Sequence, residues 1–212
     1  DSGWAVPRPR AIDNASFAHG ASGVATALLH AAVVTGRDEY RDSWRAAWKH
    51  DERFRRGDTW VDMRRDDGLP SANWCHGLTG LMLDLDDEHD LLSPDERAAV
   101  SDELLLAADG VEKYGLGLDT FALCHGVAGN LLALENVAHR LPGRSWEDEW
   151  TSMSSFGIAK DWLCGLSDHF QSYSAMSGLP GILHALAEHA MPGSPMSPLL
   201  LPSLDWGGTR AR

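Results

Sequence analysis

The sequence predicts an all-α fold built from repeated pairs of helices, on the basis of three observations. A short glycine motif occurs four times at near-equal spacing. An apolar segment with helical character follows each copy, and more polar helical segments lie between the copies. Strand signals are few. Together these features are typical of helical-repeat proteins, in which each unit buries its apolar face against the next unit.

The repeated motif is Gly-x-x-Gly. Its first glycines stand at positions 20, 77, 126 and 178, so the intervals are 57, 49 and 52 residues. One such motif carries little information, but four copies at this spacing indicate an internal repeat. The four copies are Gly20 with Gly23, Gly77 with Gly80, Gly126 with Gly129, and Gly178 with Gly181.

The segments after the glycines are predicted to be inner helices. Residues 24–34 and 182–190 are apolar on nearly all sides, which is typical of helices enclosed by others. Val127, Leu131 and Leu134 follow the i, i+4, i+7 spacing of one helical face, and the pattern extends to Leu141.

Three further segments are predicted to be outer helices. In the first, Trp44 and Ala47 belong to an apolar stripe, and Arg41, Arg45 and Lys49 are expected to face away from it. The second begins at Ser93, with Pro at the first helical position and Glu96 completing a capping box. The third covers residues 146–164. Residues 192–212 form a proline-rich tail that we expect to be extended.

These elements predict an α/α toroid, present as an incomplete ring of about four repeats. The whole chain, residues 1–212, is treated as one domain, because it is short for two. In such a ring every glycine loop lies at the same end. The residues just before each first glycine should therefore converge on the axis.

Composition excludes several classes of function. The formal charge is −13 and there is no basic patch, which argues against a nucleic-acid partner. No apolar run reaches the length of a membrane span. Three cysteines are too few for a disulfide framework, so we expect a reducing compartment, the cytoplasm.

The converging positions contain a set of metal-binding side chains. Cys75, Cys124 and His125 supply two sulfurs and one imidazole, the donors that Zn²⁺ prefers, and a fourth position would stay open for a substrate. His19 and His76 occupy the same register and could transfer a proton. The competing interpretation, a buried apolar cysteine, is the one we adopt for Cys164, which lies outside the register.

Zinc with two thiolate ligands is a weak Lewis acid for hydrolysis. A substrate thiol that enters the open position would still lose its proton, because metal-bound thiols are deprotonated. The sequence therefore favours thiol addition or alkylation.

At these residues the chain resembles the lanthionine synthetase C-like family. The matching motifs are Phe17-Ala18-His19-Gly20, Trp74-Cys75-His76-Gly77 and Leu123-Cys124-His125-Gly126. The segment Thr59-Trp60-Val61-Asp62-Met63-Arg64 and the ending Gly178-Leu179-Pro180-Gly181 resemble the cyclase domain of the two-function (class II) synthetases.

The resemblance implies a helical toroid with one zinc ion on Cys75, Cys124 and His125, and a catalytic histidine at His19. It implies addition of peptide cysteine thiols to dehydroalanine or dehydrobutyrine, which closes thioether rings. The implied partners are a dehydrated precursor peptide with its leader and a dehydratase domain that precedes the cyclase in the same parent chain. The present chain would then be the C-terminal portion of the cyclase domain.

Two alternatives stay open. The chain could be a non-catalytic relative that binds zinc, thiols or peptides. It could also be another toroid enzyme, such as a glycoside hydrolase or a terpenoid cyclase, which rely on carboxylates. An acidic run offers candidates, although such a run is typical of a solvated face. Its members are Asp84, Asp86, Asp87, Glu88 and Asp90.

Overall fold

The computed structural model describes residues 15–166 and 171–191, so the predicted tail at 192–212 lies outside the described residues. The prediction of an all-α fold is confirmed. The inner helices are α1 (Ala21–Thr35), α3 (Leu78–His89), α5 (Val127–Asn136) and α7 (Leu179–Ala190). The outer helices are α2 (Asp38–Asp51), α4 (Pro94–Gly115) and α6 (Glu147–Lys160). None of the described helices is both long and apolar enough to cross a membrane.

Short elements complete the described fold. The 3₁₀ turns η1 (Glu52–Phe54) and η2 (Ala138–Arg140) follow α2 and α5. The strands β1 (Arg55–Arg56) and β2 (Thr59–Trp60) form a small antiparallel hairpin. The outer helix predicted over 146–164 ends at Lys160, and Cys164 lies beyond it, fully buried as expected.

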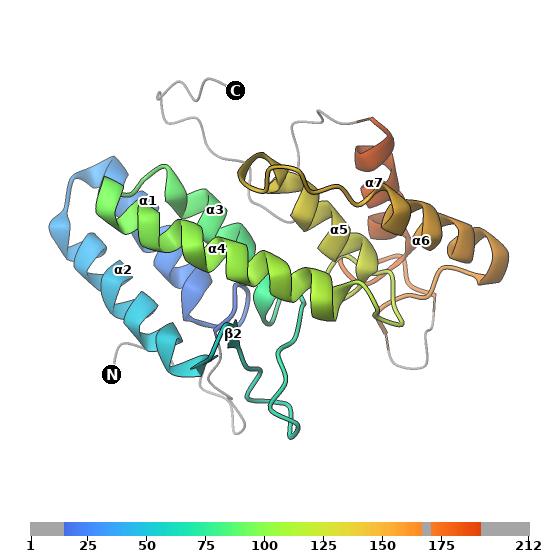
Figure 1. The fold of residues 1–212 in the computed structure, drawn as a ribbon, viewed down its shortest axis with the longest axis horizontal. Helices are drawn as coiled ribbons and strands as arrows, with labels where there is room; N and C mark the ends of the chain where they lie inside the picture. Colours follow the sequence, from blue (N-terminus) through green and yellow to red (C-terminus); the bar gives the residue numbers. More distant parts are fainter. Residues whose placement is uncertain (1–14, 167–170, 192–212) are drawn as a thin grey trace.

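The inner helices contact one another in chain order. Helix α1 packs against α3, α3 against α5, and α5 against α7. Helix α2 covers α1, α4 covers α3, and both α4 and α6 contact α5. Figure 1 shows this progression from blue (α1) to red (α7) along the long axis. The predicted alternation of inner and outer helices is therefore present.

Both glycines of each motif have a structural role. The first glycine is the N-cap of its inner helix in all four copies. At the second glycine, an added Cβ would collide with a main-chain carbonyl oxygen six residues earlier. That oxygen would lie 2.4 Å away at Gly23, 2.2 Å at Gly80, 1.9 Å at Gly129 and 1.8 Å at Gly181. Glycine thus lets the preceding loop pack directly onto the first turn of the helix.

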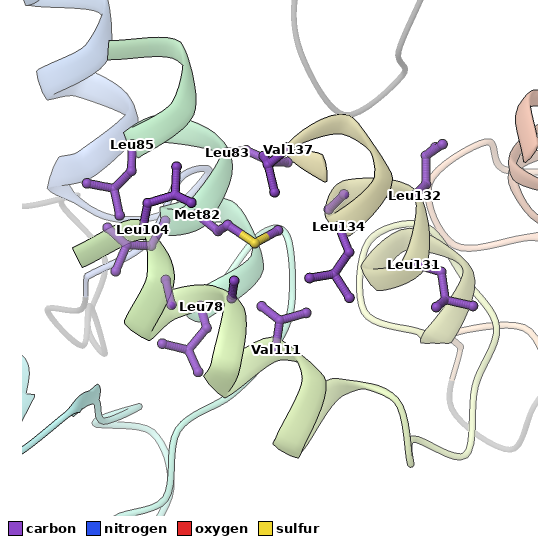
Figure 2. Close-up of a cluster of buried hydrophobic side chains, with 14 of the residues drawn as sticks. Leu78, Met82, Leu83, Leu85, Leu104, Val111, Leu131, Leu132, Leu134 and Val137 are labelled. Atoms are coloured by element: carbon purple, nitrogen blue, oxygen red, sulfur yellow. The ribbon is translucent and has the colours of Figure 1, made fainter. Parts of the chain in front are cut away.

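The core lies where α3, α4 and α5 meet. Leu78, Met82 and Leu83 of α3 are fully buried among Val111 of α4 and Leu134 of α5, and Figure 2 shows these side chains pointing toward one another. Helix α1 differs from the sequence expectation, because Val24, Val33 and Val34 are exposed and only one side of the helix is covered.

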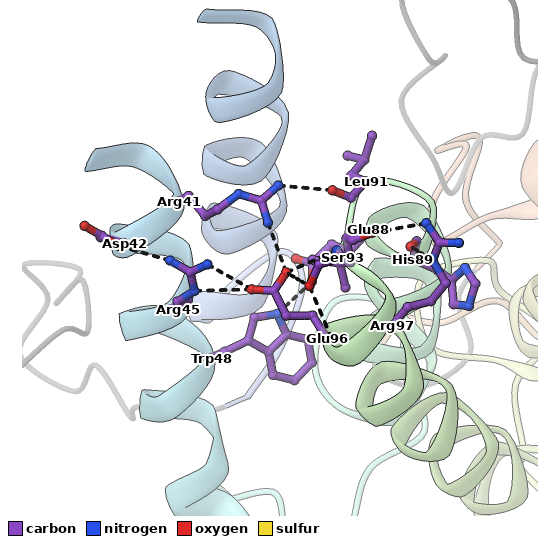
Figure 3. A network of polar contacts seen from close by, with 11 residues as sticks. Arg41, Asp42, Arg45, Trp48, Glu88, His89, Leu91, Ser93, Glu96 and Arg97 are labelled. Carbon is purple, nitrogen blue, oxygen red and sulfur yellow. Dashed lines mark hydrogen bonds and ion pairs between the residues drawn. The ribbon is translucent and has the colours of Figure 1, made fainter. Parts of the chain in front are cut away.

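A polar network joins α2 to the start of α4. The predicted capping box is present: the Ser93 hydroxyl caps the N–H of Glu96, and the Glu96 carboxylate accepts from the Ser93 N–H. Arg41 and Arg45 both donate to that carboxylate, at 3.1 and 3.0 Å (Figure 3). Arg45 and Lys49 are exposed, as expected, but Arg41 is only 25% exposed, because it also donates to the Leu91 carbonyl on the packed side.

Part of the acidic run is also not a solvated face. Asp84 and Glu88 are each 0% exposed, between α3 and the helices α1 and α2. The Thr26 hydroxyl lies 2.9 Å from a carboxylate oxygen of each, and Trp48 Nε1 donates to Glu88 at 2.7 Å. Burial raises the pKa of Asp84 well above its ordinary value and that of Glu88 to about 7.

Candidate metal centre

Main-chain hydrogen bonds hold the glycine loops together. The N–H of Trp74 donates to the carbonyl of Cys124 at 2.9 Å, and the N–H of Cys124 donates to the carbonyl of Met176 at 2.8 Å. Each of these three loops is also closed on itself by a bond from the first helical residue to the residue seven positions earlier. These bonds run from Leu78 to Ser71, from Val127 to Thr120 and from Leu179 to Ser172. The loops therefore lie side by side in fixed register.

This register gathers the predicted ligands. One ligand atom each of Cys75, Cys124 and His125 lies within 4.8 Å of the other two, and all three side chains are half-buried. Sulfurs from two repeats and a nitrogen from one thus share a single space. Two sulfurs and one imidazole nitrogen are one of the donor sets that bind zinc with a position left open.

The protonation states of the three groups are linked. The hydrogen bond from the Cys124 thiol is the main cause that lowers the pKa of Cys75 to about 4, and a second bond from His125 adds to it. The hydrogen bond to Cys75 raises the pKa of Cys124, and the hydrogen bond between His125 and Cys75 raises the pKa of His125. Cys75 is therefore a thiolate at neutral pH, and its two neighbours supply protons that a cation would displace.

The imidazole of His125 is oriented by a glycine outside the repeat. His125 Nε2 donates to the carbonyl of Gly165, which leaves Nδ1 for the sulfurs. The Gly165 N–H is itself bonded to the Ser177 carbonyl at 2.9 Å. A Cβ at position 165 would lie 2.4 Å from Nε2, so only glycine leaves room for the ring. A backbone carbonyl that accepts the second N–H is the usual partner of a metal-binding histidine.

Sequence reasoning did not find Gly165. It lies 40 residues after His125 and belongs to none of the four motifs, so neither spacing nor composition points to it. Its role depends on the path of the chain after α6.

The two remaining predicted residues lie beside Cys75. Ligand atoms of His19, Cys75 and His76 lie within 4.8 Å of one another, and His19 is the exposed member. The rings of His19 and His76 stack with centroids 4.3 Å apart and planes inclined by 15°. Burial, followed by the positive charge of Arg64, lowers the pKa of His76 to about 4. His76 is thus a neutral imidazole against which the His19 ring rests.

All five predicted site residues therefore meet in one place, in two groups that share Cys75. The soft donors, the Cys75 thiolate with its two proton-bearing neighbours, and the carbonyl behind His125 fit a zinc ion held by Cys75, Cys124 and His125. A stacked pair of imidazoles stands next to that set.

The fold and the site define a helical-repeat protein with a candidate metal centre made of two cysteines and one histidine. Residues 4–201 match the family described as lanthionine synthetase C-like protein, and the chain belongs to that family. A relative from Lactococcus lactis subsp. lactis, the lacticin 481/lactococcin biosynthesis protein LcnDR2, is 34% identical over 186 residues. The alignment covers 81% of this chain and 20% of the relative, so the chain spans about a fifth of that protein's length.

Proposed function

We propose that this chain is a zinc-dependent lanthipeptide cyclase, which adds peptide cysteine thiols to dehydroalanine or dehydrobutyrine and so forms thioether rings. The observation that carries the proposal is the convergence of Cys75, Cys124 and His125 next to the paired imidazoles of His19 and His76. Membership of the lanthionine synthetase C-like family supports it, as does the name of the Lactococcus relative as a lacticin biosynthesis protein.

Cys75, Cys124 and His125 would hold the zinc ion, which when bound supplies a deprotonated substrate thiol at neutral pH. Gly165 keeps His125 in the orientation needed for this, because its carbonyl accepts the second ring N–H. Both cysteines are half-buried, so each side chain is partly shielded from water and partly accessible.

The reaction forms one C–S bond and one C–H bond. As the thiolate sulfur attacks the β-carbon of the dehydro residue, the π electron pair moves toward the α-carbon and its carbonyl oxygen. The α-carbon then takes a proton. We assign this proton transfer to His19, because it is the exposed ring of the pair and its ligand atom lies within 4.8 Å of Cys75. His76 acts by supporting the His19 ring.

The proposal includes partners and a compartment. The substrate is a dehydrated precursor peptide with its leader, and a dehydratase domain of the same parent chain would supply the dehydro residues. Both sulfurs must stay reduced to bind metal, so we assign the reaction to the cytoplasm.

Zinc content and cyclisation, measured together, test this function. The purified chain should bind one zinc ion and cyclise a synthetic peptide with one dehydroalanine and one cysteine faster than the uncatalysed reaction. Cys124→Ala should lose most of the metal and the added rate. His139→Asn is the control, because that side chain is 56% exposed, pairs with Asp86 and belongs to neither group of site residues, so it should change neither.

Retention of full zinc by Cys124→Ala would contradict the ligand assignment. Full zinc in the wild type without any cyclisation would instead favour a non-catalytic relative that keeps the metal.

A further inference from the structure

A buried carboxylate anchors the loop that follows β2. Asp62 lies two residues after this strand, and its side chain is 1% exposed. It accepts a hydrogen bond from the Ser71 hydroxyl at 2.7 Å and from the main-chain N–H of Arg64 at 2.9 Å. A buried carboxylate with several donors of this kind holds the surrounding chain firmly.

Ser71 connects this anchor to the metal loop. Its carbonyl accepts from the N–H of Leu78 at 2.8 Å and packs against Gly77, whose φ of 107° suits only glycine. Cys75 and His76 lie within this closed turn. The position of Asp62 is therefore fixed relative to the proposed zinc ligand.

Arg64 is held on the same carboxylate. Its Nε lies 2.9 and 3.1 Å from the two oxygens of Asp62, and Nη2 also donates to that carboxylate. Among the described residues, the guanidinium has no other hydrogen-bond partner, so Nη1 remains available. The side chain is 35% exposed, and its anchor Asp62 is bonded through Ser71 to the turn that contains Cys75 and His76.

We propose that Arg64 is a substrate-binding residue, which donates a hydrogen bond from Nη1 to a carbonyl oxygen of the peptide beside His76. The Asp62–Ser71 pair serves to aim this donor. The inference rests on the proposed cyclase function and names one more group of that site. The group that Arg64 would bind is a peptide amide oxygen. The amide oxygen conjugated to the reacting double bond would be stabilised most, because it gains negative charge during the addition.

That oxygen gains negative charge during the addition. When sulfur bonds to the β-carbon, the π pair shifts onto the α-carbon and the carbonyl oxygen, and it returns when the α-carbon is protonated. A fixed guanidinium N–H stabilises the charge at this stage without forming or breaking a bond to the peptide.

Arg65 provides a matched control next in the chain. It pairs with Asp67 at the protein surface, and both side chains are nearly half exposed. Arg65→Gln removes one positive charge from the same loop, as Arg64→Gln does, but leaves the side-chain bonds between Arg64 and Asp62 intact.

The experiment compares Arg64→Gln, Arg64→Lys and Arg65→Gln in the full zinc-loaded chain. Cyclisation of the synthetic dehydroalanine–cysteine peptide gives kcat and KM, and calorimetric titration with the cyclic thioether product gives a binding constant. Zinc content and Tm are measured for each. Arg64→Gln should lower kcat/KM about 100-fold, the effect of removing one charge-stabilising donor. Arg64→Lys should lose less, and Arg65→Gln should match the wild type.

The split between parameters identifies the oxygen. A loss in kcat with product binding unchanged assigns Arg64 to the reacting carbonyl, whereas equal losses in KM and product affinity assign it to another peptide oxygen. Arg64 variants that keep zinc and match Arg65→Gln in both readouts would overturn the inference while the cyclase function stands. If Arg64→Gln does not fold, Arg64→Lys decides. A wild type that neither cyclises nor binds the peptide would refute the proposed function itself.

Discussion

The N–H of Trp74 donates a 2.9 Å hydrogen bond to the carbonyl of Cys124, so the residue before the first sulfur is tied to the residue that carries the second. Cys124 is tied in the same way to Met176 of the next loop. These main-chain bonds therefore hold the donor-bearing loops next to one another.

The second glycine of each motif should tolerate no side chain. A Cβ at Gly129 would lie 1.9 Å from the Leu123 carbonyl oxygen, directly beneath Cys124. We expect Gly129→Ala to cost roughly 2 kcal/mol or more of the free energy of unfolding, because the backbone must shift. Gly117→Ala is the control, since nothing lies within 4 Å of its Cβ position. Denaturant unfolding measures both, and equal stability of the two variants would contradict this account of the loop.

Gly165→Ala should weaken metal binding although Gly165 offers no ligand atom. Its Cβ would press on His125 Nε2 and on the Ala122 side chain, which turns the imidazole away from the sulfurs. We expect zinc affinity to fall about 10- to 100-fold, as for other groups that orient a metal ligand. Competition with a zinc chelator gives the value, again beside Gly117→Ala. An unchanged affinity would show that the Gly165 carbonyl does not orient His125.

His19→Asn should separate metal binding from turnover. Asparagine keeps a polar side chain of similar reach but cannot deliver a proton at neutral pH. We therefore expect full zinc content with kcat lowered by about 10²–10⁴-fold. The control is His139→Asn, a histidine whose side chain is 56% exposed and which pairs with Asp86 away from the site. Normal turnover by His19→Asn would move the proton transfer to another group.

Stability should depend on pH through Glu88. Its pKa is raised from the ordinary 4.5 to about 7, mainly by burial, so the folded state binds the proton more tightly than the unfolded state. Stability from this group is therefore complete below pH 4.5 and is lost as pH rises to about 7. Asp84 shifts in the same direction. The difference for Glu88 corresponds to roughly 3 kcal/mol.

Glu88→Gln should accordingly raise the free energy of unfolding by about 1–3 kcal/mol at pH 8 and leave it nearly unchanged at pH 4.5. Denaturant unfolding at the two pH values measures this, with Asp102→Asn, an exposed position on α4, as the control. A gain of equal size at both pH values would show that proton binding by Glu88 is not its cause.

The glycine motifs account for most of what could be predicted from the sequence. They locate the start of each described inner helix, because the helix N-cap is glycine in all four motifs and the close approach of the loop backbone requires a second glycine. They also place Cys75 and Cys124 in equivalent positions, with His125 directly after the second cysteine. Their meeting in space follows once the repeats stack in register.

Other features depend on neighbours that the linear pattern does not specify. The acidic run at the end of α3 has the composition of a solvated surface, yet Thr26 and Trp48 turn Asp84 and Glu88 into an interior cluster. Arg41 and Arg45 reach Glu96 for a similar reason. These contacts join residues about 40 to 60 positions apart, where neither periodicity nor capping rules apply.

Glycines define the close packing of all four loops, and main-chain bonds close three of them, so the loop backbone is held by contacts that do not involve the side chain at the ligand position. Ala18, Cys75, Cys124 and Met176 occupy that position in four successive loops, and two of them carry no metal-binding group suited to zinc. The four loops thus carry equivalent side-chain positions, each just before an inner helix. The same helical framework therefore presents a metal-binding side chain in two of its loops and an apolar one in the other two.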